Sequence, residues 1–303
     1  MKKGPTLFVK IFAPGLGDLV VLSPILYNLK EKRIVDKLNL IVLTESQKQL
    51  AERMYWIDNT YLDGEKFPVD KYDFFVDMAK HPLEKDLWWG SNEYIKRFGK
   101  KHVTYVMNEI VGGCGLPDKI PTFRVEDVSK KDQKFYNKTV LIAPGGRRKI
   151  KQVKTETWEE LIRELNSRGY HACIIGNRHH KGSEQVKELR DKGYLTIETG
   201  HLGRLIDIIY HSAGLIGIDS GLYHIASIMN KPTVGVFGAM PSWLWGGLGE
   251  KTVNIEREVP VNLTTASLDW EFMNGGNPLT DDITAEELIY SFELAMEKGE
   301  NGE

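Results

Sequence analysis

Apolar positions along the chain alternate between short β-type runs and stretches with helical spacing. Strands are predicted in the first half at 7–13, 38–43 and 72–76. Helices are predicted there at 18–32, from 47 onward, and at 92–110. The stretch 117–132 is polar and holds two prolines, so it is the best candidate for a linker.

The same alternation then begins again. Strands are predicted in the second half at 139–143, 171–175, 215–218 and 233–237. Helices are predicted there at 155–167, 183–192, 202–212, 222–229 and 284–298. Thr155 is expected to cap its helix and Gly169 to follow its end, while Thr284 with Glu287 forms a capping-box pattern.

Strands that alternate with helices predict an α/β protein with parallel sheets and right-handed crossovers. A chain of 303 residues suits two domains. We expect one at 1–135 and the other at 136–303, two doubly wound domains that face a cleft. The last helix, 284–298, either stays with the second domain or packs back on the first.

Composition narrows the class of protein. Apolar residues make up 41% and charged residues 27%, which is too apolar for a disordered chain. Two cysteines, Cys114 and Cys173, exclude a disulfide scaffold or a four-cysteine zinc site. No signal peptide or run of about 18 apolar residues is visible, so a cytoplasmic protein is expected.

The net charge of -2 hides an asymmetry between the two halves. Residues 1–138 hold 23 basic and 19 acidic residues, a net of +4, while 139–303 hold 17 and 23, a net of -6. Two domains with different roles fit this asymmetry, and chance is the alternative. The basic half suits an anionic or lipid-linked acceptor, and it weakly permits nucleic acid.

Three loops are expected at the carboxyl ends of strands, where doubly wound sheets bind ligands. The first, 14–18, holds Gly15 and Gly17 but has Val20 where a dinucleotide fingerprint needs a third glycine. Glu45 is only a weak candidate for the ribose-binding acid, which disfavours a nicotinamide cofactor. Asp18 then has two interpretations, an N-cap or a carboxylate that points toward a ligand.

The other two loops suit an anionic ligand. The loop 144–154 contains five bases next to a predicted helix start, which favours a phosphate site over a merely solvated loop; these bases are Arg147, Arg148, Lys149, Lys151 and Lys154. In the third loop, a buried strand leads to Asp219, and Ser220 and Gly221 present amide groups suited to a diphosphate. His224 could reach the same ligand or be a satisfied core histidine.

These segments resemble glycosyltransferase family 9, which contains the lipopolysaccharide heptosyltransferases. The resemblance is carried by Gly217-Ile-Asp-Ser-Gly-Leu-Tyr-His-Ile-Ala-Ser227, Lys231-Pro-Thr-Val-Gly-Val-Phe-Gly238, Gly17-Asp-Leu-Val20 with Ser23-Pro24, and Lys151-Gln-Val-Lys-Thr-Glu-Thr-Trp158. It implies the GT-B fold of two Rossmann-like domains and an inverting, metal-independent sugar transfer. The second domain would bind the nucleotide-diphosphate sugar.

The resemblance also implies roles for individual residues. Asp18 matches the general base, Lys151 matches the lysine on the donor phosphates and sugar, and Asp219 matches the acid that holds the donor sugar. The diphosphate-binding turn corresponds to Ser220 and Gly221, with His224 beside it. Gly17 and Arg147 complete the donor-binding set that we expect. The stretch 177–181, Asn-Arg-His-His-Lys, departs from the acidic residue of the heptosyltransferases, so ADP-heptose is one candidate donor among several.

Elementary chemistry agrees with such a transfer, which needs one carboxylate base and cations for the leaving diphosphate. No Asp-x-Asp triplet is present, and His179-His180 lacks a third ligand at suitable spacing, so no metal is expected. The tryptophans at 88–89 and 243–245 could stack on a sugar but are better explained by packing. Expected partners are the nucleotide-sugar donor, a saccharide or glycolipid acceptor, and a membrane surface in peripheral contact. Open alternatives are a nucleotide-sugar-binding module, a GT-B epimerase, and transfer to nucleic acid.

Overall fold

The computed structural model describes residues 4–68, 72–81, 92–146, 151–176, 184–238, 240–257 and 280–298. Contacts within the chain separate it into two compact units. Unit 1 comprises Met1–Val125 with His201–Gly203, and unit 2 comprises Glu126–Gly200 with Arg204–Glu303. Each unit is described by itself. None of the described helices combines the length and the apolar character needed to span a bilayer.

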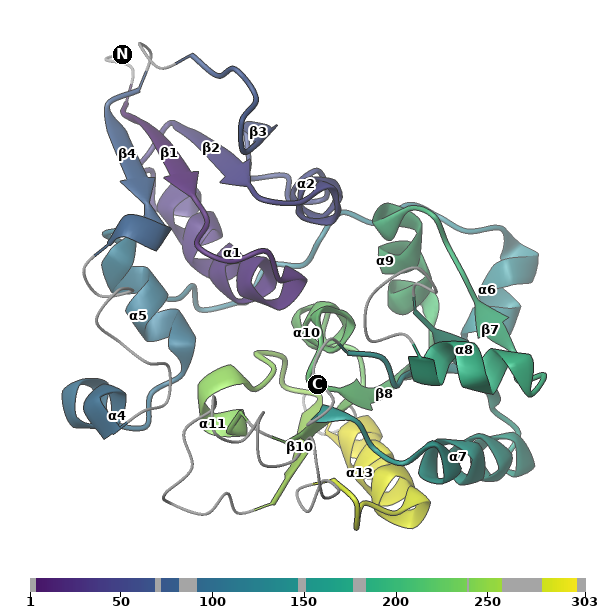
Figure 1. The fold of residues 1–303 in the computed structure, drawn as a ribbon. Coiled ribbons are helices and arrows are strands. Elements are labelled where there is room, and N and C mark those ends of the chain that lie inside the picture. The colour runs from purple at the N-terminus through teal and green to yellow at the C-terminus, as the bar shows by residue number, and fades with distance from the viewer. Residues whose placement is uncertain are drawn as a thin grey trace. The chain divides into compact units, whose positions relative to one another are not determined.

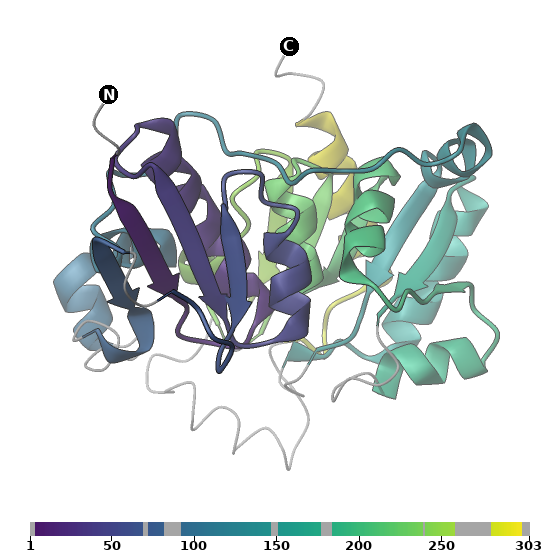
Figure 2. The ribbon, with the colours of Figure 1, turned by 90° about the horizontal axis from the view of Figure 1, so that it is seen from above.

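Unit 1 is built on a parallel sheet of four strands in the order β3-β2-β1-β4 (Figure 1). Its strands are β1 (Thr6–Lys10), β2 (Lys37–Val42), β3 (Asn59–Leu62) and β4 (Phe74–Asp77). Its helices are α1 (Leu16–Glu31), α2 (Glu45–Ala51), the 3-10 turn η1 (Met78–Lys80), α4 (Asn92–Phe98) and α5 (Val103–Ile110). Figure 2 shows the strands of this sheet pointing in the same direction.

The helix predicted at 92–110 is wrong as a single element. The structure has two helices there, α4 and α5, separated at Gly99. Gly99 has a φ of +68°, a left-handed conformation that ends α4 and that other residues rarely adopt. The chain then turns, and His102 caps the start of α5 by accepting a hydrogen bond from the Thr104 amide.

Helix α1 continues past an internal proline. Pro24 has no N–H, so the Val20 carbonyl loses the donor that a residue four positions later normally supplies. The Ser23 hydroxyl donates a hydrogen bond to that carbonyl at 2.8 Å. The Ser-Pro pair of the sequence motif therefore has a structural explanation, because the serine replaces the hydrogen bond that the proline removes.

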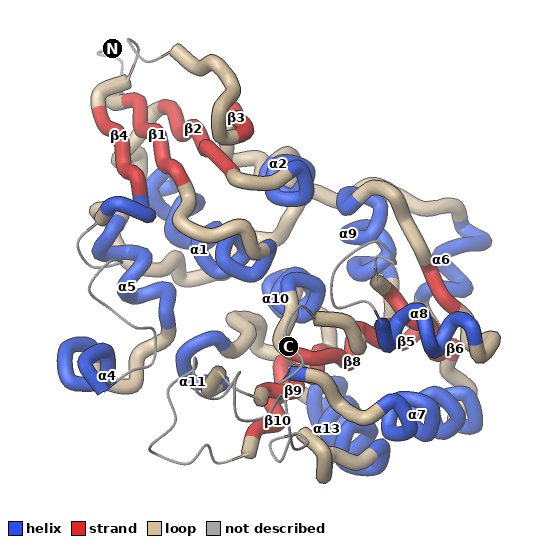
Figure 3. Tube along the Cα trace, in the orientation of Figure 1, coloured by secondary structure: helices blue, strands red, loops and turns tan. Residues whose placement is uncertain are grey.

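Unit 2 is built on a parallel sheet of six strands in the order β10-β9-β8-β5-β6-β7. Its strands are β5 (Thr139–Ala143), β6 (His171–Ile175), β7 (Thr196–Ile197), β8 (Gly214–Ile218), β9 (Thr233–Phe237) and β10 (Thr252–Glu256). The helices of this part of the chain are α6 (Lys130–Tyr136), α7 (Thr155–Ser167), α8 (Glu184–Asp191), α9 (Leu202–His211), α10 (Gly221–Ile228), α11 (Ser242–Trp245) and α13 (Ala285–Glu297). Helices α7 and α13 pack together on one face of the sheet and α10 on the other (Figure 3).

The two predicted helix starts in unit 2 differ in outcome. Thr284 caps α13 by accepting a hydrogen bond from the Glu287 amide at 3.1 Å, as predicted. The Glu287 carboxylate instead binds the guanidinium of Arg257 at 2.7 Å. The prediction that Thr155 caps α7 is wrong, because Lys154 occupies the cap position and the Thr155 hydroxyl donates to Glu188.

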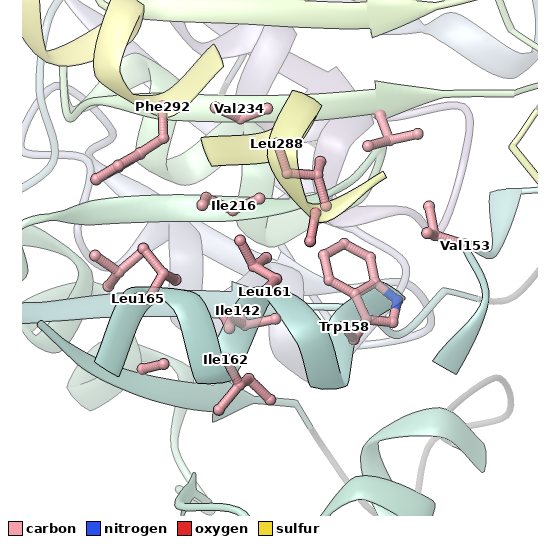
Figure 4. Close-up of a cluster of buried hydrophobic side chains, with 14 of the residues drawn as sticks. Ile142, Val153, Trp158, Leu161, Ile162, Leu165, Ile216, Val234, Leu288 and Phe292 are labelled. Atoms are coloured by element: carbon pink, nitrogen blue, oxygen red, sulfur yellow. The ribbon is translucent and has the colours of Figure 1, made fainter. Parts of the chain in front are cut away.

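A hydrophobic cluster between the sheet and helices α7 and α13 forms the core of unit 2 (Figure 4). Trp158, on the first turn of α7, is fully buried there among Val153, Leu161 and Leu288. Its indole N–H has no hydrogen-bond partner among the described residues. The tryptophan that closes the Lys151–Trp158 motif is therefore a packing residue, and it lies directly after the loop that carries Lys151.

We expect Trp158→Ala to lower the free energy of unfolding by about 3–5 kcal/mol, because a buried aromatic side chain leaves a cavity. Trp158→Phe should cost much less, since it keeps most of the ring volume and removes an unsatisfied N–H. Equilibrium urea unfolding of both variants measures the difference. If Trp158→Phe lowered the free energy of unfolding as much as Trp158→Ala, the prediction would fail, and the indole N–H would have to make a stabilising hydrogen bond.

Candidate active site

The central feature of unit 2 is the point where its chain changes direction across the sheet. From β5 the chain continues to β6 and β7 on one side, while β8, β9 and β10 lie on the other. The loops that follow the neighbouring strands β5 and β8 therefore meet at the carboxyl edge of the sheet. In doubly wound sheets, ligands bind at this position.

Three charged or titratable side chains meet at this edge. Lys151, from the loop after β5, donates hydrogen bonds to the Asp219 carboxylate and, at 3.4 Å, to the Asp219 carbonyl. Asp219 follows β8 directly, and its other carboxylate oxygen lies 3.2 Å from Nε2 of His224. Asp219 is 7% exposed and His224 4% exposed, while the Lys151 side chain is 18% exposed, so the network is buried at Asp219 and His224 and partly open to solvent at Lys151.

The electrostatics of Asp219 depend on its partners. Burial by itself raises the pKa of this carboxyl group, but the charge of Lys151 and the hydrogen bond from His224 outweigh burial and hold the pKa well below its ordinary value. Asp219 is therefore ionised at neutral pH. The positive charge of Lys151 balances the negative charge of the Asp219 carboxylate.

The start of α10 presents further polar groups next to this network. Ser220 occupies the cap position of α10, and its hydroxyl makes no hydrogen bond with any described residue. The Nδ1 atom of His224 is likewise buried and unpartnered within the described residues. Gly221 is the first helical residue, so its amide group belongs to the partial positive charge at the helix N-terminus. The arrangement can bind an anionic group such as a diphosphate.

A second network holds α10 in place. The hydroxyl of Tyr223 donates to Asn254 Oδ1 at 2.5 Å and accepts from the Gly247 amide at 2.5 Å. Gly235 leaves room for that ring, because a Cβ at position 235 would lie 2.3 Å from it. Tyr223, the residue before His224, thereby ties α10 to Asn254 and Gly247.

In unit 1 the corresponding direction change lies between β1 and β4. The loop after β1 leads into α1, with Gly15 at the cap position and Gly17 and Asp18 in the first turn. The interpretation of Asp18 as an N-cap is therefore wrong. Its carboxylate occupies the first turn, where the helix dipole stabilises a negative charge.

Two polar residues of unit 1 were not predicted from the sequence. Gln47 is fully buried, and its amide donates to the carbonyls of Ala13 and Gly15 at 2.8 and 2.9 Å, which braces the loop before α1. Asp77 ends β4 beside Lys10 of β1, and its Oδ1 is buried without a partner among the described residues. The sequence did contain a signal for Asp77, because an acid directly follows the strand predicted at 72–76. It contained no signal for Gln47, because a single glutamine in a helical pattern does not indicate burial.

The remaining expected features are distributed as follows. Lys151, Asp219, Ser220, Gly221 and His224 come together in unit 2, and Gly17 and Asp18 lie in unit 1. Arg147, the stretch 177–181 with its histidine pair, and the tryptophans at 88–89 lie outside the described residues. Within the described ranges, no three His, Cys, Asp or Glu side chains are grouped as a metal site would need.

Comparisons with known proteins place this geometry in context. Residues 101–264 match the family model described as glycosyltransferase family 9 (heptosyltransferase). Among curated proteins, 136 residues are 28% identical to the human collagen alpha-5(VI) chain, a match that takes in 42% of this chain and only 5% of that protein. The chain thus spans about one-twentieth of that relative, and a match of this extent shows no family.

Solved structures agree on the fold. The chain is similar to the ADP-heptose lipopolysaccharide heptosyltransferase II of E. coli, with 15% identity, a TM-score of 0.71, and coverage of 97% of this chain and 99% of that chain. It is similar to a family 9 glycosyl transferase of Veillonella parvula at 14% identity, TM-score 0.72, and coverage of 98% and 99%. The iron-containing dodecameric glycosyltransferase TibC of E. coli is similar at 16% identity, TM-score 0.62, and coverage of 98% and 77%. The predicted α/β fold with parallel sheets is confirmed.

Proposed function

Because the chain belongs to glycosyltransferase family 9, we propose that it transfers a sugar from a nucleotide-diphosphate donor to a hydroxyl group of a saccharide or glycolipid acceptor. The observation that carries this proposal is the buried network of Lys151, Asp219 and His224 at the start of α10. The family match favours transfer over the binding module, the epimerase and the nucleic-acid acceptor.

The donor binds at the direction change of unit 2. Its diphosphate takes up the amide groups at the start of α10, the free Ser220 hydroxyl and the Nδ1 side of His224. Lys151 shifts part of its interaction from Asp219 to the diphosphate. Asp219 then has a carboxylate oxygen available for a hydroxyl of the donor sugar. Arg147 and Gly17, which the family resemblance assigns to the donor-binding set, stay predictions.

The transfer is inverting and proceeds by direct displacement. The acceptor oxygen forms a bond to the anomeric carbon while the bond from that carbon to the diphosphate oxygen breaks. Asp18 takes the proton of the acceptor hydroxyl as general base. Lys151 and the helix start stabilise the charge on the departing diphosphate, so the reaction needs no metal ion.

ADP-heptose is the donor that we propose first, because the similar E. coli enzyme is described as an ADP-heptose transferase. The acceptor is a saccharide or glycolipid of lipopolysaccharide assembly. The protein works in the cytoplasm, in peripheral contact with the membrane that holds such an acceptor.

Thermal unfolding with ADP-, UDP-, GDP- and dTDP-sugars tests the donor. A donor at a hundred times its Kd stabilises the protein by about 2.7 kcal/mol, which for a unit of this size raises Tm by roughly 5–10 °C. We expect ADP-heptose to give the largest shift. Lys48→Met, far from the site in sequence, should keep that shift, and no shift with any of the four sugars would contradict the proposal.

Chelators test the metal-independent mechanism. Sugar release from the donor should be unchanged by EDTA and by an iron-specific chelator. This comparison matters because the similar TibC structure is described as iron-containing. Loss of activity that added iron or magnesium restores would contradict a metal-independent transfer.

A further inference from the structure

Unit 1 carries a compact group of cations at the end of α4 and in the turn that follows it. Lys96 and Arg97 lie in the last turn of α4, and Lys100 and Lys101 lie between α4 and α5. All four side chains are exposed. In the described part of the chain, none of them is in an ion pair. We call these four residues the 96–101 surface.

The backbone beneath this surface is held firmly. Tyr94 and Phe98 point from α4 into the interior, where they are 0% and 8% exposed, with ring centroids 5.2 Å apart. The Tyr94 hydroxyl donates to the Lys101 carbonyl at 3.0 Å, which fixes the turn after Gly99. These contacts hold the backbone that carries the four cations, and the Arg97 guanidinium lies 5.4 Å from the centre of the Phe98 ring.

An aromatic side chain adjoins the cations. Tyr105 on α5 is 50% exposed, and Lys101 Nζ lies 5.6 Å from the centre of its ring. The buried face of α5, formed by Val103, Val106 and Met107, leaves Tyr105 on the outer face. A tyrosine with an apolar ring and a polar hydroxyl suits the depth of lipid headgroups.

Local stability does not explain the whole group. Lys96 and Arg97 complement the negative end of the α4 dipole, which is a common role for cations at a helix C-terminus. Lys100 and Lys101 lie beyond that helix, where the dipole interaction no longer applies. The acids of the two helices are Glu93 in α4 and Glu109 in α5, so the segment 92–110 keeps more cations than acids.

We propose that the 96–101 surface, with Tyr105, docks unit 1 on an anionic phospholipid bilayer. Clusters of four to eight Lys or Arg residues bind anionic leaflets, each contributing about 1 kcal/mol near the surface. Four cations and one aromatic ring give reversible, salt-sensitive contact rather than permanent anchoring.

This inference adds a lipid partner to the proposed transfer and deepens the membrane contact proposed with it. Its test does not depend on the reaction, because vesicles contain neither donor nor acceptor. If vesicles bind and no sugar is transferred, the transfer proposal fails alone. If sugar is transferred and vesicles do not bind, the lipid proposal fails alone.

Co-sedimentation with vesicles tests the surface. The full chain should bind vesicles of phosphatidylglycerol and phosphatidylcholine at low ionic strength, bind pure phosphatidylcholine weakly, and be released in about 0.5 M salt. The fourfold variant Lys96→Gln, Arg97→Gln, Lys100→Gln, Lys101→Gln should lose roughly tenfold or more in affinity. Tyr105→Ser, which changes no charge, should weaken binding by a smaller factor.

A matched control removes the same charge from unit 2. Lys130, Lys131, Lys134 and Lys138 are four exposed lysines in and just after α6, and their fourfold change to glutamine should leave vesicle binding within about twofold of wild type. Equal losses in the two variants would show that only the total charge matters and would overturn the proposal. So would an absence of binding by wild type, or tighter binding to duplex DNA that the 96–101 variant abolishes. Unchanged Tm values for all variants confirm that each is folded.

Discussion

Asp18→Asn is expected to lower sugar transfer at least a hundredfold, because general bases typically contribute about 10²–10⁴ in rate. Asparagine has nearly the same shape as aspartate but cannot accept the acceptor proton. Asp18 is half-buried in the first turn of α1, so the substitution should disturb the fold little. Release of the nucleotide from the donor, with water or a saccharide as acceptor, measures the effect.

Two controls make this result specific. Asp63→Asn removes an exposed carboxylate that pairs with Lys10 in the same unit and should leave turnover unchanged. The shift in Tm that the donor causes should be the same in Asp18→Asn as in wild type, because the groups proposed to hold the diphosphate, at the start of α10, lie in unit 2. Undiminished turnover in Asp18→Asn would remove Asp18 as the base.

Lys151→Met is expected to destabilise unit 2 by about 3–5 kcal/mol, because it leaves the buried Asp219 carboxylate without its cation. Donor affinity should fall at the same time by roughly tenfold to a hundredfold, the value of a charge-assisted hydrogen bond. Urea unfolding and donor titration measure the two effects. The double variant Lys151→Met, Asp219→Asn should recover much of the lost stability but none of the lost affinity.

The pH dependence of this pair has a definite sign. The folded pKa of Asp219 is depressed, so the pair's contribution is fully present above the unfolded value of about 4 and is lost as pH falls through the folded pKa. Lys48→Met, which breaks the exposed pair with Glu65, should change Tm little. If Lys151→Met and Lys48→Met lowered the free energy of unfolding equally, the buried Lys151–Asp219 pair would stabilise the protein no more than an exposed ion pair does.

The interior of each sheet could be predicted from the sequence, while most edges could not. Strands β5, β6 and β9 are short apolar runs that are almost entirely buried, and their predicted bounds agree with the structure. The strands that were missed, β3, β7 and β10, all lie at sheet edges. Their exposed or half-buried positions give no continuous apolar run, and β7 has only two residues.

The site was predictable where a motif is local and not where it depends on distant contacts. Asp219, Ser220 and His224 lie within six residues, so one segment predicts that they are neighbours. The contact between Lys151 and Asp219 joins residues 68 positions apart, and the family resemblance suggested roles for both without showing that they meet. The support that Gln47 gives the loop before α1 depends on its burial, which the local pattern does not indicate.

The position of β5 also constrains how the protein is made. β5 is the first strand of unit 2 in the chain and lies at the centre of its sheet, where it pairs with both β6 and β8. During synthesis it leaves the ribosome long before β8 does, so one side of this strand, which is fully buried in the folded protein, waits without a partner. Unit 1 has a comparable delay, because its central strand β1 pairs on one side with β4, which begins only at Phe74. The donor site is therefore assembled only after β8 has left the ribosome, and until then the unpaired side of β5 is open to aggregation and to chaperones.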